Sequence, residues 1–377
     1  MMTTERTAIR RRLAIGRRAH RPPRGVWKAG HGSIVAPLAA TVAVTLVLGV
    51  GVALARTERE RRALRQRKRE RRQFAPLKQE PLGSGHRRMA LGQLDIAIEA
   101  LEGGAGKASP EERVHEARKA LKRLRALVRL LRDELGEQTY ERESALLRDA
   151  GRRLARARDA EVLLSTLEDL IARHRGKLAS RRGVLRLRAH LQQERDGAAE
   201  MALAASATHA GTLAELRALR ARVSEWELAE PGGIEAIEPA LERLYGKGCK
   251  RMRRAAKAKG EARRTRTLHE WRKRVKDLRY AAEMLGARKV AKRADDLGEL
   301  LGEEHDLAVL AQRVRREAKA GRASGAPGRR SRKLLLKLIA KRRARLRKRA
   351  LRDGERLYAR KPARFVRRVR KRAVSRR

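Results

Sequence analysis

The 377-residue chain is poor in cysteine and in aromatic residues: it contains one cysteine, and Phe, Trp and Tyr make up only 2% of it. With Cys249 alone, the chain cannot form an intrachain disulfide bond or a cysteine-rich zinc site. The scarcity of aromatic rings leaves few platforms for stacking nucleic-acid bases. Acidic residues are also few, because 44 Asp and Glu stand against 97 Lys and Arg, for a formal net charge of +53. A chain this basic repels itself when compact, which favours a function against a large anionic partner.

The hydrophobic fraction of 41% is ordinary, so the chain as a whole is not a disordered basic tail. Residues 1–32 are polar and basic and are expected to be disordered. Residues 33–55 contain no charged residue and are long enough to cross a bilayer, so they predict a transmembrane helix. Residues 56–84 form a basic juxtamembrane segment. It is interpreted equally well as a contact for anionic lipid headgroups or as a solvated linker.

Two features leave the membrane topology open. Ala53-Leu54-Ala55 fits a signal-peptide cleavage site, so a cleaved signal peptide with an exported domain is the alternative to a membrane anchor. Basic residues are nearly equal in number on the two sides of the apolar run. The positive-inside rule therefore does not orient the helix.

From Gly85 onward, apolar residues recur every three or four positions, which predicts an all-α region without strands. Breaks rich in Gly or Pro are expected at residues 103–106, 231–233 and 321–328. The middle break divides residues 85–370 into halves of similar size, residues 85–230 and 231–370. Equal halves invite a search for an internal repeat.

The two halves share a motif, in which a His is followed by Arg, Lys, Lys and Arg at offsets 3, 4, 7 and 10. At about 100° per residue these positions occupy one face of a helix, and apolar residues occupy the adjoining face. Each helix is expected to pack one side into a core and to present a basic stripe suited to a linear polyanion. The stripe residues are His115, Arg118, Lys119, Lys122 and Arg125 in the first half, and His269, Arg272, Lys273, Lys276 and Arg279 in the second.

A second pair of matching segments follows, Arg158-Asp159 in the first half and His305-Asp306 in the second. We expect each Asp to cap the next helix, the alternative being that it orients the neighbouring basic group. Further basic positions in helical register are Arg152, Lys247, Lys250 and Arg251.

A charged position on a helix is usually only solvated, but matching residues at matching phase favour a shared ligand. Each His is open to two interpretations, a structural histidine or a phosphate ligand. If the histidines bind as cations, affinity should rise as pH falls through the His pKa region. No metal site is predicted, because each motif supplies one His and the stripe has no coordinating carboxylate.

The paired H-x-x-R-x-x-x-K-x-x-R helices, the RD and HD segments and the LYGKG stretch resemble the CHAD family, the conserved histidine α-helical domain. The resemblance spans about Gly85 to Arg370 and is most specific in the two His helices. It implies two antiparallel four-helix bundles, related by a pseudo-two-fold, around a basic channel that binds inorganic polyphosphate. By position it implies ligand contacts from His115, Arg118, Lys122, Arg125, Arg158, His269, Arg272, Lys276 and Arg279. One departure from the family pattern is that the second half has His305 where the first half has Arg158. Another is the amino-terminal apolar run, which the family motif does not explain.

Taken together, the residues and the resemblance predict non-catalytic binding of polyphosphate without a cofactor, at a membrane or a polyphosphate granule. The alternative is a basic helical protein that binds nucleic acid non-specifically. Catalysis is not predicted, because no nucleophile, metal-binding carboxylates or Walker-type loop accompany the stripes. We expect a single-pass membrane protein with a cytoplasmic helical domain, since an intracellular polyanion would place the domain there.

Overall fold

The computed structural model describes residues 74–77, 79–103, 109–154, 159–204, 206–228, 234–320 and 327–374. The chain divides into two units, Met1–Leu64 and Arg65–Arg377, and all described residues belong to the second. The predicted tail, the transmembrane helix predicted at residues 33–55 and most of the juxtamembrane segment lie outside the described residues, as does Arg158. Within the described ranges, no helix is both long enough and apolar enough to cross a bilayer.

The described helices of the first half are α2 (Leu82–Glu102), α3 (Pro110–Leu130), α4 (Arg132–Leu135), α5 (Glu137–Arg153), α6 (Asp159–Arg173), α7 (Arg175–Leu178), α8 (Arg182–Ala204) and α9 (Ser206–Ser224). α3, which carries the first motif, starts with a capping box. The Ser109 Oγ accepts a hydrogen bond from the Glu112 N–H at 3.3 Å, and the Glu112 carboxylate accepts one from the Ser109 N–H at 3.0 Å. Pro110 follows at the first helical position, where its fixed φ suits a helix start.

The described part of the second half consists of η2 (Ile234–Ile237), α10 (Glu238–Ala256), α11 (Glu261–Met284), α12 (Arg288–Ala320), α13 (Arg329–Leu357) and α14 (Pro362–Val374). α11 carries the second motif. No strand occurs in the described part of the chain, which confirms the all-α prediction. Two predicted breaks are also confirmed, because α2 ends before Gly103 and residues 321–328 separate α12 from α13.

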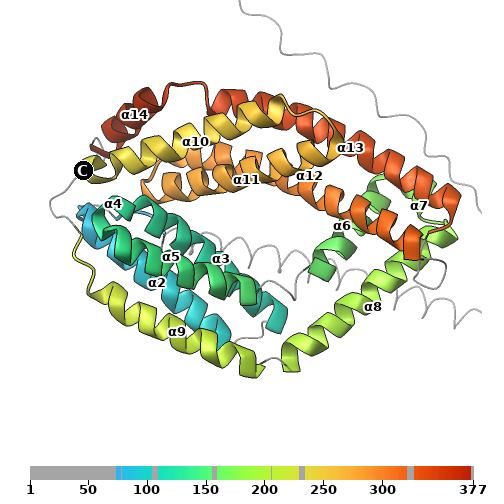
Figure 1. Ribbon diagram of the computed structural model, residues 1–377, viewed down its shortest axis with the longest axis horizontal. Helices are drawn as coiled ribbons and strands as arrows, with labels where there is room; N and C mark the ends of the chain where they lie inside the picture. The colour runs from blue at the N-terminus through green and yellow to red at the C-terminus, as the bar shows by residue number, and fades with distance from the viewer. Residues whose placement is uncertain are drawn as a thin grey trace, which may run out of the picture. The chain divides into compact units, whose positions relative to one another are not determined.

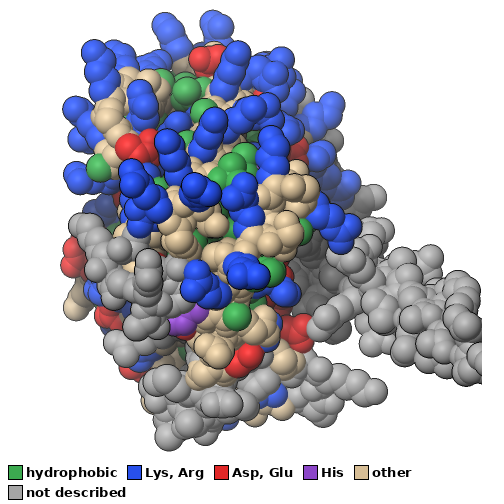
Figure 2. Space-filling model, turned by 90° about the vertical axis from the view of Figure 1, so that its right-hand side faces the viewer, with side chains coloured by type: hydrophobic (Ala, Val, Ile, Leu, Met, Phe, Trp, Pro, Cys, Tyr) green, Lys and Arg blue, Asp and Glu red, His purple; other side chains and the backbone are tan. Residues whose placement is uncertain are grey.

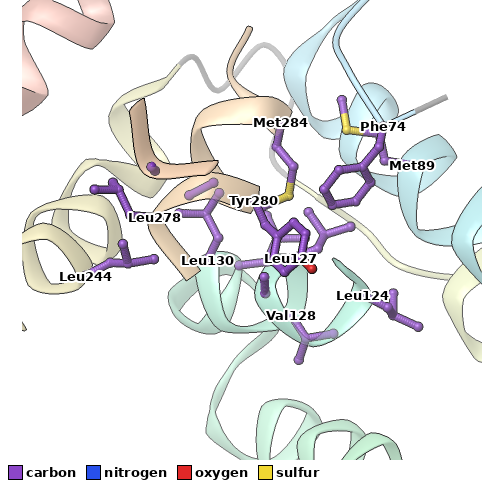
Figure 3. Packing of buried hydrophobic residues seen from close by; sticks show 14 of the residues in the cluster. Phe74, Met89, Leu124, Leu127, Val128, Leu130, Leu244, Leu278, Tyr280 and Met284 are labelled. Atoms are coloured by element: carbon purple, nitrogen blue, oxygen red, sulfur yellow. The ribbon is translucent and has the colours of Figure 1, made fainter. Parts of the chain in front are cut away.

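The apolar faces predicted for the two motif helices are buried. They consist of Val114, Ala117, Leu121, Leu124 and Val128 on α3, and of Leu268, Trp271, Val275, Leu278 and Ala282 on α11. Figure 3 shows side chains of α3, such as Leu130, meeting side chains of α11, such as Leu278, in one core. Because each fully buried Leu or Val contributes about 1.5–3 kcal/mol, this core holds both motif helices in fixed orientation.

Two hydrophobic cores organise the described helices, and they do not follow the boundary between the halves. α2, α3, α5 and α9 form one packed group, α10 to α13 form another, and both contribute to the larger core (Figure 1). The second core joins α6 and α8 of the first half to the C-terminal part of α12 and the N-terminal part of α13 (Figure 1). The two halves are therefore interleaved and share their cores.

The halves differ where the second pair of matching segments lies. In the first half α5 ends at Arg153 and α6 begins at Asp159, whereas in the second half α12 continues from Arg288 to Ala320. Asp306 lies in the middle of α12, so the prediction that it caps a helix was wrong. The apolar face of α12 continues through this segment, with Leu301, Leu307 and Leu310 all buried, and packing therefore sustains the helix.

Candidate functional site

The motif helices α3 and α11 pack against each other, which makes their basic stripes neighbours. The stripe residues on both helices are half-buried, apart from the exposed Lys273. Lys122 of α3 lies close enough to Lys276 of α11 to lower its pKa. These two lysines hold the same place in their copies, seven residues after the His. The structure therefore brings the two copies of the motif together at this position.

The charge of Lys276 is strongly perturbed. Burial, reinforced by Arg272, Lys122 and Arg279, lowers the pKa of Lys276 from 10.5 to about 7, although Asp306 acts in the opposite direction. Near neutral pH this lysine is therefore about half protonated. An anion placed beside it would raise its pKa again and restore the positive charge.

The two histidines of the second half are in contact. The ring centroids of His269 on α11 and His305 on α12 are 4.3 Å apart. Burial, reinforced by nearby cations such as Arg272, lowers the pKa of both rings from 6.5 to about 4. Each Nδ1 is buried and has no hydrogen-bond partner among the described residues. Both rings are thus neutral near pH 7. Within the described residues, no group of three or more His, Cys, Asp or Glu is arranged to hold a metal ion.

A buried ion-pair network links α13 to the helices that carry these histidines. Arg343 of α13 is only 4% exposed and donates two hydrogen bonds to Glu304 of α12, at 2.9 and 2.6 Å. It also donates to the Thr265 hydroxyl of α11 at 2.9 Å and to Glu261 at the start of the same helix. Burial raises the pKa of Glu304, and Arg343 partly offsets this effect. The network joins α11, α12 and α13 around the two rings.

A cavity of about 510 Å³ opens between α6, α11, α12 and α13. Arg272 reaches its wall over Gly302 of α12, where an added Cβ would lie 3.4 Å from the guanidinium. The wall contains charges of both signs, and its cations include three residues of the second stripe. The cations are Arg173, Arg272, Lys276, Arg279 and Arg342, and the carboxylates are Glu161, Asp169, Asp295, Glu299, Glu303 and Asp306.

The last arginine of each stripe has a different environment. Arg279 of α11 pairs with Asp295 at 2.5 Å and with Glu283 at 3.1 Å, and these carboxylates outweigh burial and raise its pKa. Arg125 of α3 forms no ion pair with a described carboxylate. Burial lowers the pKa of Arg125, and so do nearby arginines, of which Arg129 has the largest effect. Asp277 of α11 raises the pKa of Arg125 but does not offset these effects, so the last stripe position has paired carboxylates in one copy and only partial compensation in the other.

Some predicted positions carry charge that is already paired. Lys119 and Lys273 each pair at 2.9 Å with the glutamate three residues before them. Arg152 is exposed on α5 and lies 3.3 Å from Asp149, although its charge is felt at Arg125. Because a neighbouring carboxylate already compensates their charge, these three cations are expected to contribute less to binding than Arg125 and Lys276.

The predicted residues of α10 lie away from the cavity beside α11. Lys247 and Lys250 are exposed, and Arg251 lines a separate cavity of about 410 Å³ together with other arginines. Gly248, which lies between them, has a packing role, since a Cβ there would lie 2.5 Å from the Tyr358 hydroxyl. The Tyr-Gly-Lys-Gly stretch therefore packs α10 against Tyr358, just after α13, and against Phe365 of α14, on which Tyr245 stacks.

Sequence reasoning missed residues that depend on tertiary contacts. Arg129 of α3 pairs with Asp277 of α11 at 2.6 Å and so joins the two motif helices. Arg342 of α13 reaches the cavity and pairs with Glu303 at 2.7 Å. The sequence could have pointed to Asp277, because it is a carboxylate within the basic motif and occurs in only one of the two copies. Nothing in the sequence distinguishes Arg342 or Arg343 from the other cations of the C-terminal run.

Comparison with known proteins agrees with this helical domain and its paired cationic helices. The family model described as CHAD domain matches residues 88–315, which include both motif helices, and the chain therefore belongs to the CHAD family. A similar solved structure is the crystal structure of the CHAD domain from the plant Ricinus communis, with a TM-score of 0.53 and 22% identity over 74% of this chain and 96% of that chain. At this identity the likeness concerns the fold. A search of curated proteins found no match.

Proposed function

We propose that the surface formed by α3 and α11 binds inorganic polyphosphate without altering it. The observation that carries the proposal is the packing of α3 against α11, with Lys122 near enough to Lys276 to lower its pKa, so that equivalent cations of both copies lie on neighbouring helices. Like charges repel at close range, and burial adds to the cost of keeping Lys276 charged. A linear polyanion relieves this repulsion, and so its binding is favoured there.

Binding of this kind proceeds by exchange of counterions. Lys and Arg side chains replace the small cations condensed on the polyanion, and their release drives association. Arg118 and Arg272, each three residues after a motif His, supply forked donors that fit two phosphate oxygens. Lys276 supplies a charge that the ligand itself strengthens, because a nearby anion raises its pKa.

The charged environment favours a particular path for the polyphosphate. Arg279 already has two carboxylate partners, and the cavity wall beyond it adds others that repel phosphate. Arg125 has no carboxylate partner among the described residues. We propose that the chain follows α3 along Arg125 and Lys122 and meets α11 at Lys276 and Arg272.

A competition experiment tests the polyphosphate assignment. Fluorescent polyphosphate of defined length is bound to the full chain in detergent micelles at moderate salt. Unlabelled polyphosphate and short duplex DNA of equal total charge are then added in parallel. We expect polyphosphate to compete at much lower concentration. Equal competition by duplex DNA would contradict the proposal, because charge alone would then explain binding.

The claim that the bound chain is not altered has its own test. The full chain is incubated with long polyphosphate and magnesium, and the product is sized on a gel. We expect the length distribution to stay unchanged over hours. Shortening that depends on the protein, and that Arg118→Ala/Arg272→Ala abolishes, would identify an enzyme instead.

We also propose that residues 33–55 anchor the protein in a membrane, with the helical domain in the cytoplasm. The support is the length of the uncharged run, which suffices for a membrane-spanning helix. The full chain should resist alkaline extraction from membranes, whereas Leu46→Arg/Leu48→Arg should be extracted. Protease added outside intact cells should leave the helical domain uncut. Extraction of the unaltered chain would contradict the anchor, and cleavage outside would contradict the orientation.

A further inference from the structure

The C-terminal helices hold a large share of the positive charge that the site on α3 and α11 does not use. Residues 329–374 contain 22 Lys and Arg but only two carboxylates, Asp353 and Glu355. The apolar side of α13 is occupied in the core, where Leu335, Leu338 and Leu346 are buried. The remaining surface of α13 is therefore a polar face that no described helix covers.

A row of cations runs along this outer face of α13, which we call the α13 row. All of its members are exposed, and none forms an ion pair with a described carboxylate. Arg342 and Arg343, in contrast, lie on other sides of the same helix and pair with Glu303 and Glu304. The α13 row consists of Lys333, Lys337, Lys341, Arg345 and Lys348.

The spacing of the α13 row fits a phosphate backbone. Successive members are three or four residues apart, which is about 5–6 Å along a helix, and the whole row spans about 22 Å. Each strand of duplex DNA advances about 3.4 Å per phosphate. Because the strand also winds around the duplex axis, the straight row meets a few consecutive phosphates of one strand where α13 crosses the backbone. Ala340 and Ala344, which lie exposed between the cations, leave room for a close approach.

The basic surface widens at the start of α13. A Cβ on Gly183 would lie 3.1 Å from the Ser331 Cβ, so the start of α8 touches the start of α13. Arg182 and Arg186 of α8 are exposed beside this contact and have no described carboxylate partner. Figure 2 shows Lys and Arg side chains crowding the face at this end of the molecule, with few acidic side chains among them.

We propose that the α13 row binds double-stranded nucleic acid along its phosphate backbone, independently of the surface on α3 and α11. Electrostatic contact alone supports non-specific nucleic-acid binding, so a face without aromatic rings suffices. A membrane surface fits less well, because helices that lie on a bilayer insert an apolar face. The apolar face of α13 is buried in the core, and Leu185 of α8 is the one large apolar side chain exposed near this end within the described residues.

The test compares two triple variants of the full chain with equal loss of charge. The first, Lys333→Gln/Lys337→Gln/Lys341→Gln, removes three members of the α13 row. The control, Arg288→Gln/Lys289→Gln/Arg293→Gln, removes three exposed cations at the start of α12 that have no described carboxylate partner. Binding of a fluorescent 20-base-pair duplex is measured by anisotropy at several salt concentrations. Helical circular dichroism confirms that all three proteins are folded.

We expect the first variant to reduce the slope of log affinity against log salt by about 2.7, since each lost phosphate contact contributes about 0.9. The control should change the slope by less than about 1, and neither variant should weaken polyphosphate binding. Two duplexes of different sequence should behave alike. Equal losses in both triple variants would overturn the proposal. It would also be overturned if the first variant affected binding to anionic vesicles but not to the duplex, or if saturating polyphosphate displaced the duplex completely.

Discussion

The two copies of the motif hold the same cations in different surroundings. On α11, Arg279 is neutralised by Asp295 and Glu283. On α3, the equivalent Arg125 lies among arginines that lower its pKa together with burial. The position four residues further along explains part of this difference, because it is Glu283 in one copy and Arg129 in the other. Both copies of the motif thus contain the same cations, but only Arg279, the last arginine of the second copy, forms ion pairs with described carboxylates.

The different surroundings of Arg125 and Arg279 indicate two roles for buried cations, a structural role and a ligand-binding role. Charge that is buried and paired with carboxylates holds helices together, as Arg343 does with Glu304. Charge that is half-buried without such partners is costly until an anion arrives, and is therefore available for binding. By this criterion Arg125 of α3 contributes to binding, and Arg279 at the far end of α11 contributes mainly to structure.

The largest effect is expected from removing the buried ion pair between α13 and α12. Arg343→Leu leaves Glu304, which is 1% exposed, buried without its partner. Uncompensated burial of one charge costs about 3–5 kcal/mol, so the free energy of unfolding in urea should fall by this amount. The double variant Arg343→Leu/Glu304→Leu should recover most of the loss. A decrease below about 1 kcal/mol for the single variant would show that the network does not hold α11 in place.

A smaller effect should follow from crowding the core of the second copy. Two residues after the motif His, α3 has Ala117 and α11 has Trp271. A Cβ on Gly354 of α13 would lie 2.5 Å from this Trp ring, so Gly354→Ala should destabilise the fold by about 1–3 kcal/mol. Gly92→Ala is the matched control, because that site has open space, and it should stabilise the helix by about 0.5–1 kcal/mol. Thermal unfolding of both variants measures the contrast, and equal destabilisation would refute it.

The comparison predicts unequal losses of polyphosphate affinity from equivalent substitutions. Arg125→Ala removes a cation without a described carboxylate partner, and it should weaken binding by about tenfold, since a hydrogen bond to a charged group contributes about 1.5 kcal/mol or more. Arg279→Ala removes a cation that is already neutralised, and the loss should be about threefold or less. Isothermal titration of both variants gives the ratio. A larger loss for Arg279→Ala would reverse the proposed division between the copies.

The smallest predicted effect is a pH dependence centred on Lys276. Its pKa of about 7 means that raising the pH from 7 to 9 removes the positive charge in the free protein. The bound anion raises this pKa, so binding takes up a proton and affinity falls with increasing pH. For a bound-state pKa higher by about half to one unit, the decrease is about threefold. Lys276→Gln should flatten the profile over this range, and an unchanged profile in that variant would exclude Lys276 as its source.

The sequence predicted the parts of this structure that depend on local pattern. The apolar periodicity of α3 and α11 predicted both buried faces, and glycine-rich segments predicted where α2 and α12 end. It did not predict that α12 runs unbroken past Asp306, because burial of Leu307 and Leu310 sustains the helix there. The contact between His269 and His305 and the neutralisation of Arg279 depend on how α11 meets α12, which the periodicity of either helix leaves unspecified.

The central claim is that the duplicated cations of α3 and α11 bind polyphosphate. Its most direct test is titration of the full chain with polyphosphate of one length at several salt concentrations, comparing Arg118→Ala/Arg272→Ala with the exposed-site control Lys257→Gln/Lys259→Gln. We expect a weaker affinity for the first variant and a salt slope reduced by about 1.5, because two phosphate contacts are lost. The control should stay close to the unaltered chain. Unchanged affinity and slope in a folded Arg118→Ala/Arg272→Ala protein would contradict the claim.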